Sequence, residues 1–366
     1  MNQLKSIQTL RAIAALAVMF AHLQGLESQL SGDTPILSNA WIAGVSGVDL
    51  FFVISGFIMV WIAGDWQSGT RSSAKFLFSR VLRIYPLWWL FAAITAAYFF
   101  VTLGAPWDVD RIAEDGGVMH LVKSFLLLPQ GPPPVLLLGW TLIHEMYFYL
   151  VFALILLLPV KARKPAFLLW AAIIAASTAL QLTGFSADSL LSLALFPLTL
   201  EFLLGSAVAW IIRAGFTRFA VTALIIGGVG LVFAIIHVDF TTVTDLQPTY
   251  RTLAYGPAYA LIVYGLVSLE QRGVGKRFFP NMLVRIGDWS YSLYLCHILV
   301  ITAVARVFFS TFSTAGPLDN LLFLLIAGSL AIAVSGLTYT LFEKPLLQRT
   351  RNVRKRLFSA APQAGA

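Results

Sequence analysis

Ten long apolar runs constrain the fold of this 366-residue chain more than any other feature of its sequence. A helix needs about 20 apolar residues to cross the hydrocarbon core of a bilayer, and helices satisfy their own backbone hydrogen bonds there. Hydrophobic residues make up 58% of the chain and charged residues 11%, which is too apolar for a soluble domain. We therefore predict an all-α polytopic membrane protein with about ten transmembrane helices. The runs are 7–24, 42–63, 84–103, 139–159, 166–183, 190–212, 219–237, 251–269, 288–309 and 321–342.

The basic residues predict how these helices are oriented. An even number of spans puts both ends of the chain on one side of the membrane. Of the 25 Lys and Arg residues, all but Arg111, Lys123, Arg251 and Arg306 then fall on that side. Because basic loops stay in the cytoplasm, we expect cytoplasmic N- and C-termini. The same rule explains the formal net charge of +8, so no nucleic-acid partner is expected.

No polar stretch is long enough to form a second folded domain. We expect one transmembrane domain over residues 1–343 and a basic cytoplasmic tail over 344–366, with 347–366 disordered near anionic lipid. Within 104–138, the stretch LVKSFLLLP is too short to span and is followed by GPPP. This pattern predicts an interfacial or re-entrant piece.

Arg11 and His22 share the first apolar run, in RAIAALAVMFAH. At 100° per residue, eleven steps bring the second side chain back to within about 20° of the first, roughly 16.5 Å further along the axis. Ionisable residues inside a membrane are costly and indicate a functional site by default. With a cytoplasmic N-terminus, Arg11 is expected at the cytoplasmic mouth and His22 further inside, as two positions along one path.

His22 is the best candidate for a catalytic base, because an imidazole can take a proton from a hydroxyl and return it near neutral pH. A helix-to-helix hydrogen bond is the alternative role for a membrane histidine. Asp49, in GVDLFFVISGF, is expected to orient His22 and support its charge. Gly44, Gly47 and Gly56 are expected to let helices approach closely there.

Arg80 and Arg83, in SRVLRIYP, form a second pair at the predicted cytoplasmic end of the third run. Their i, i+3 spacing puts both guanidinium groups on one face, which suits a phosphate-bearing ligand, although such residues also serve as snorkelling anchors. Glu145, in GWTLIHEMYFYL, lies near the predicted outer end of the fourth run. Its aromatic neighbours suit sugar recognition, and local ion pairing is the alternative.

Other polar groups in the runs have no role that the sequence assigns. They are His144, Glu201, Asp288 and His297. Such a set indicates a polar interior, either a catalytic chamber or a transport path, unless its members only pair between helices. The single cysteine, Cys296, is expected to be buried and inert, and it excludes an internal disulfide or a multi-cysteine metal site. We expect no metal cofactor.

Six segments in order resemble the acyltransferase-3 family of integral membrane acyltransferases. They are LRAIAALAVMFAH, GVDLFFVISGF, RVLRIYP, GWTLIHEMYFYL, IGDWSYSLYLCH and FEKP, and they extend over nearly the whole chain. Arg11 and His22 match the family's arginine–ten–histidine motif, and Arg80 and Arg83 match its Arg-x-x-Arg motif. Glu145 is retained, whereas His144 departs from the Asn, Ser or Val that commonly precedes it.

Within the family the chain looks most like bacterial exopolysaccharide O-acetyltransferases. The resemblance implies ten spans in the bacterial inner (cytoplasmic) membrane and acetyl-CoA as acyl donor on the cytoplasmic side. The implied acceptor is a hydroxyl of a polysaccharide or lipid-linked sugar, and exopolysaccharide biosynthesis proteins are expected partners. Arg11, Arg80 and Arg83 would bind the donor, and His22, with Asp49 and Glu145, would carry the catalysis. A succinyl or other acyl transferase and a glycan transporter or flippase are the alternatives.

Overall fold

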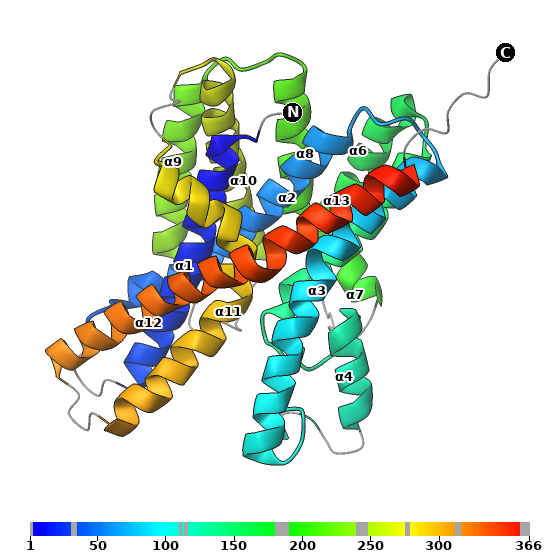
Figure 1. The fold of residues 1–366 in the computed structure, drawn as a ribbon. Helices are drawn as coiled ribbons and strands as arrows, with labels where there is room; N and C mark the ends of the chain where they lie inside the picture. The colour runs from blue at the N-terminus through cyan, green and yellow to red at the C-terminus, as the bar shows by residue number, and fades with distance from the viewer. Residues whose placement is uncertain are drawn as a thin grey trace. The chain divides into compact units, whose positions relative to one another are not determined.

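The computed structural model describes residues 3–30, 35–109, 112, 116–179, 190–238, 248–274, 279–311 and 316–358. In these ranges every regular element is helical and no strand occurs, as predicted (Figure 1). The chain divides into two compact units, each described separately below. Unit 1 is Met1–Ile62 with Phe196–Leu337, and unit 2 is Ala63–Leu195 with Thr338–Ala366.

Most helices of each unit lie where apolar runs were predicted; α4 and α13 lie outside those runs. Unit 1 holds α1 (Lys5–Leu30), η1 (Asn39–Ser46), α2 (Gly47–Ala63), α8 (Thr199–Arg213), α9 (Ala220–His237), α10 (Pro248–Gln271), α11 (Asn281–Thr311) and α12 (Pro317–Thr338). Unit 2 holds α3 (Thr70–Leu103), α4 (Gly117–Leu126), α5 (Gly139–Leu157), α6 (Val160–Ala179), α7 (Leu190–Ala194), the π-helical turn η3 (Tyr339–Glu343) and α13 (Lys344–Phe358).

In the described part of the chain, nine helices are long and apolar enough to cross a membrane. The one predicted span without a counterpart among these nine helices is 166–183, which overlaps α6. The first two turns of α6 contain Lys161, Arg163 and Lys164, and these charges lower its mean hydropathy. The chain is therefore a multi-pass helical membrane protein, and the side on which its termini lie stays a prediction.

In unit 1, a stripe of apolar residues on α1 packs into the core. Ala12, Ala15, Met19 and Leu23 recur every three or four positions and are completely buried. They join side chains of α11 and α12, including Phe323, in one apolar cluster. Because three- and four-residue spacings keep side chains on one face, this stripe fixes which face of α1 meets α11. That orientation also brings His22 against α11.

Glycines allow the closest helix approaches in unit 1, as predicted. A Cβ atom on Gly56 of α2 would overlap the backbone oxygen of Phe202 in α8, and one on Gly205 of α8 would overlap that of Val53. Gly44 and Gly47 similarly face backbone oxygens of α1. Inside a bilayer the hydrophobic effect does not drive helices together, because lipid tails are as apolar as the side chains. Close backbone contact is therefore a source of packing energy for membrane helices.

In unit 2, α3 holds the short helix α4 by its carboxyl end. The Trp88 and Trp89 indole N–H groups and the Tyr85 hydroxyl donate to three consecutive carbonyls, those of residues 124–126, at 3.1, 3.0 and 2.9 Å. These donors satisfy carbonyls that a helix end leaves without partners. With only ten residues, α4 is too short to span, as predicted for this stretch.

The expectation of disorder over 347–366 is wrong for its first part, because α13 is helical as far as Phe358; residues 359–366 lie outside the described ranges. Leu347, Thr350, Arg354 and Phe358 form its less exposed face. Arg354 donates to Ser79 Oγ of α3 at 3.0 Å. Packing against α3 supplies the helix-stabilising contact that the composition of this segment does not reveal.

Candidate active site

His22 of α1 is held as one tautomer, with its second ring nitrogen unused. Its Nδ1 lies 2.8 Å from the carbonyl oxygen of Val18, one turn earlier, and only a protonated nitrogen makes a favourable contact there. The lone pair is therefore on Nε2. Nε2 is buried and has no hydrogen-bond partner among the residues that the structure describes. A ring fixed at one nitrogen with a free lone pair on the other is the arrangement that a general base requires.

His297 of α11 lies beside this ring. Its Nδ1 is 2.9 Å from the carbonyl oxygen of Leu293, so its own lone pair is on Nε2. That Nε2 is 3.4 Å from His22 Nδ1. The two rings meet edge to face, with centroids 5.0 Å apart and planes inclined at 64°. His297 is completely buried, so the contact is shielded from water.

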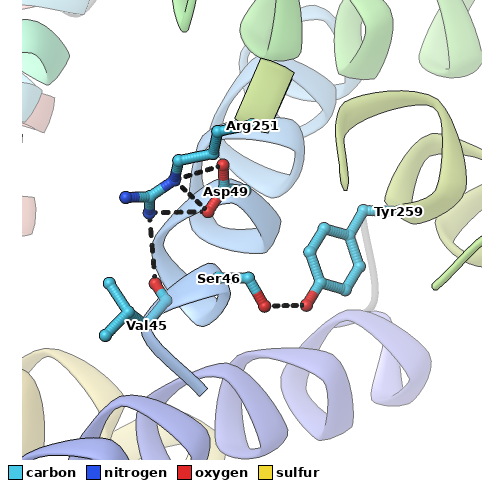
Figure 2. Close-up of polar contacts among 5 residues, drawn as sticks. All are labelled: Val45, Ser46, Asp49, Arg251 and Tyr259. Carbon is cyan, nitrogen blue, oxygen red and sulfur yellow. Dashed lines mark hydrogen bonds and ion pairs between the residues drawn. The ribbon is translucent and has the colours of Figure 1, made fainter. Parts of the chain in front are cut away.

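Asp49, expected to orient His22, instead binds Arg251 of α10 (Figure 2). The Arg251 Nε and Nη2 atoms donate to the Asp49 carboxylate at 2.7–3.0 Å, and Nη2 also donates to the Val45 carbonyl at 3.2 Å. Both side chains are buried, with exposures of 0% and 1%. A buried carboxylate needs a cation, and the fork of an arginine meets that need better than a neutral imidazole does.

Glu201 of α8 is a second carboxylate in this buried cluster. The charges of Asp49 and Arg251 both act on it. Both of its carboxylate oxygens are buried and find no hydrogen-bond partner in the described ranges. Because one guanidinium cannot neutralise two carboxylates, this buried cluster holds more acidic groups than basic ones. The structure therefore gives Glu201, to which the sequence assigned no role, a place beside Asp49.

A hydrogen-bonded hydroxyl pair continues this cluster in Figure 2. Ser46 Oγ of η1 and the Tyr259 hydroxyl of α10 lie 2.7 Å apart. Together with the ion pair, this contact ties η1 and α2 to α10 by polar bonds. The cluster around Asp49 therefore holds helices together, through bonds that join η1 and α2 to α10.

In unit 2, Arg80 and Glu145 belong to one cluster through Tyr149. The Arg80 guanidinium lies 5.3 Å from the centre of the Tyr149 ring, and the Tyr149 hydroxyl donates to Glu145 Oε1 at 2.5 Å. The charges of Arg83 and Glu145 both act on Arg80. Glu145 was expected near the outer side of the membrane and the arginine pair at the cytoplasmic side, and that separation is therefore wrong. Gly69, just before α3, donates its N–H to the carbonyl of Leu156, at the end of α5, so the two helices run antiparallel. This arrangement brings Arg80 to the level of Tyr149 and Glu145.

This cluster has the chemistry of an anion site. Arg80 stacks on Phe76 as well as Tyr149, and its Nε–H is buried with no hydrogen-bond partner in the part of the chain that the structure describes. Stacked arginines keep their donors free for oxyanions. Two arginines against one glutamate leave a net positive charge, which favours a phosphate-bearing ligand.

The structure also places three other residues that the sequence singled out: Arg11, Cys296 and His144. Arg11 is on the same continuous helix as His22, α1, and donates to Gln8 Oε1 at 3.3 Å. Cys296 is buried as expected, with Sγ 3.9 Å from carbonyls of α11 and α12, on another side of the helix than His297. His144 meets the ring of Trp140 edge-on, with centroids 5.9 Å apart. Nothing in these contacts gives His144 or Cys296 a catalytic role.

Sequence reasoning missed three partners that the structure supplies: Arg251, His297 and Tyr149. Arg251 was only counted among the basic residues on the side opposite the termini, and His297 had no assigned role. Each contacts a residue that the sequence did single out, namely Asp49, His22 and Glu145. For Tyr149 a signal existed, because residues four apart on a helix face each other. The other two contacts join segments far apart in the sequence and leave no local pattern.

Comparison with known proteins agrees with the resemblance. Residues 4–340 match the model of the acyltransferase-3 family, described as an acyltransferase domain. The exopolysaccharide production protein ExoZ of Rhizobium meliloti (strain 1021) is 32% identical over 316 residues, which cover 84% of this chain and 91% of ExoZ. The acyltransferase MdmB of Streptomyces mycarofaciens is 30% identical over 391 residues, covering 96% and 94%.

Protein 2 of the picA locus of Rhizobium radiobacter is 31% identical over 158 residues, covering 39% of this chain and 78% of that protein. No solved structure gives a significant match. The family match spans almost all of the helices described above, including those that carry His22, Arg80 and Glu145. The chain therefore belongs to the acyltransferase-3 family and is an integral membrane acyltransferase.

Proposed function

We propose that the protein transfers an acetyl group from acetyl-CoA to a hydroxyl of an exopolysaccharide or other bacterial surface glycan. The observation that carries this proposal is the free Nε2 atom of His22, a base held in a dry interior. The relative ExoZ is named for exopolysaccharide production, which supports a glycan acceptor. The proposal covers polymeric and lipid-linked sugars alike, because both offer the same hydroxyl chemistry.

In this proposal His22 Nε2 takes the proton of the sugar hydroxyl as the oxygen attacks the thioester carbonyl carbon. A C–O bond forms, the C–S bond breaks, and the proton passes from His22 to the departing sulfur. The products are an O-acetyl ester and free coenzyme A, with no net change in protons. Burial of the site limits hydrolysis of the thioester. An acetyl-enzyme on His22 would use the same residue in two steps.

The donor's phosphates would bind the positive cluster of Arg80 and Arg83 in unit 2. Planar guanidinium groups bind phosphate oxygens through paired hydrogen bonds. Glu145 and Tyr149 would orient Arg80, which gives Glu145 a positioning role in place of sugar recognition. Arg11 would line the donor's entry. We place the protein in the bacterial inner membrane, where cytoplasmic acetyl-CoA and the machinery of exopolysaccharide biosynthesis are both in reach.

The test is transfer by the purified, detergent-solubilised protein from radiolabelled acetyl-CoA to an exopolysaccharide fragment, beside labelled succinyl-CoA. We expect alkali-labile label on the glycan from acetyl-CoA. Preferential succinyl transfer would assign a different donor. Movement of glycan across vesicles with acetyl-CoA left intact would replace the proposal with a transporter.

A further inference from the structure

We propose that His297 is a positioning residue for the His22 base. The inference deepens the proposed function and rests on it. The geometry is a chain of three contacts: His297 Nδ1–H donates to the Leu293 carbonyl, His297 Nε2 faces His22 Nδ1–H, and His22 Nε2 carries the free lone pair. Each contact fixes the tautomer of the next ring.

The contact strengthens at the moment of proton transfer. In the resting state His22 Nδ1–H is shared between the Val18 carbonyl at 2.8 Å and His297 Nε2 at 3.4 Å. When Nε2 takes the hydroxyl proton, the His22 ring becomes a cation and its Nδ1–H becomes a better donor. A neutral acceptor at this position then stabilises the cation more than the resting ring. An interaction that is stronger in the transition state raises kcat.

The surroundings keep His297 in its acceptor form. Its side chain is completely buried, and its Nδ1 is already committed to the Leu293 carbonyl. The Tyr294 ring, with its centroid 6.1 Å away, covers it from the same helix. Because Asp49 is bound to Arg251, the carboxylate usually expected behind a catalytic histidine is replaced here by a second imidazole.

Two polar substitutions separate positioning from packing. His297→Gln puts an amide oxygen where Nε2 lies, within reach of His22. His297→Asn keeps a polar group near the Leu293 carbonyl but is too short to reach His22. The matched control is His237→Asn, since His237 makes the same contact to a carbonyl one turn earlier, at 2.9 Å, on the exposed face of α9.

The readout is kcat and KM for acetyl transfer, measured for each substrate in turn. We expect His297→Asn to lower kcat about 30-fold, less than the roughly 10²–10⁴-fold that proton-transfer catalysis contributes as a whole, with KM changed less than about twofold. His297→Gln should recover kcat to within about threefold of wild type, and His237→Asn should equal wild type. Added to His22→Ala, the His297→Asn change should cause no further loss.

Equal kcat for His297→Asn and His297→Gln would overturn the positioning role, as would a fall in kcat/KM that comes entirely from KM. The His22→Ala variant distinguishes a failure of the proposed function from a failure of the inference about His297. If His22→Ala retains transfer, the proposed base fails. If it abolishes transfer while His297→Asn matches wild type, only the inference about His297 fails.

Discussion

Removing Arg251 leaves the buried Asp49 carboxylate without its cation. We predict that Arg251→Met destabilises the protein strongly, because Asp49 loses three hydrogen bonds of 2.7–3.0 Å from a guanidinium that is 1% exposed. Breaking a buried ion pair by deleting one partner costs about 3–5 kcal/mol, since the remaining charge stays desolvated. At about 2.1 cal/mol/K per residue, the entropy of unfolding of 366 residues is roughly 0.8 kcal/mol/K, so the Tm should fall by about 4–7 °C.

The assay is thermal unfolding of the purified protein in one detergent, followed by loss of the monodisperse size-exclusion peak. Arg285→Met is the matched control, because Arg285 is an exposed arginine of unit 1 that lies 5.9 Å from the Trp289 ring. Its Tm should change by less than about 2 °C.

The double variant Asp49→Asn, Arg251→Met removes both charges together. It should recover more than half of the lost Tm, because a neutral pair no longer carries an uncompensated buried charge. The reasoning is refuted if Arg251→Met unfolds at the same temperature as Arg285→Met, or if the double variant is no more stable than the single one.

Two further predictions test the close helix approach and the donor cluster. Gly56→Ala should lower the free energy of unfolding by about 1–3 kcal/mol, because the added Cβ overlaps the Phe202 backbone. Gly228→Ala on α9, where a Cβ meets no atom within 4 Å, should match or exceed wild-type stability; equal losses in the two glycine variants would contradict the packing argument. Tyr149→Phe should raise the KM for acetyl-CoA about fivefold with little change in kcat, since Arg80 and Glu145 lose the hydroxyl that links them. Tyr147→Phe, which loses a hydroxyl contact to the Ala194 carbonyl, is its control, and an equal KM in both variants would argue against the cluster.

The helices were predictable because hydrophobicity alone defines a membrane span. Each predicted run lies on helical residues of the structure, although α6 as a whole is too polar to count among the nine candidate spans. The boundaries were not predictable, and one of them mattered. Helix α3 begins at Thr70, whereas the predicted run began at residue 84. Arg80 and Arg83 therefore lie inside the helix, where the charge of Glu145 acts on Arg80.

His22 stood out in the sequence because an ionisable residue in an apolar run has few structural explanations. The contact between His22 and His297 could not be predicted, because His297 lies on α11 and only the packing of α1 on α11 brings the rings together. The same limit explains Asp49. A carboxylate near a histidine in sequence suggests a catalytic pair, but the bond to Arg251 of α10 forms only in the folded protein.

The most direct test of the central claim is the initial rate of acetyl transfer from labelled acetyl-CoA to the glycan by wild type and by His22→Ala. Both proteins must be monodisperse and have the same Tm. We predict that His22→Ala lowers the rate by about 10²–10⁴-fold, because the hydroxyl proton then has no base to accept it. A His22→Ala rate equal to that of wild type would contradict the assignment of His22 as the base.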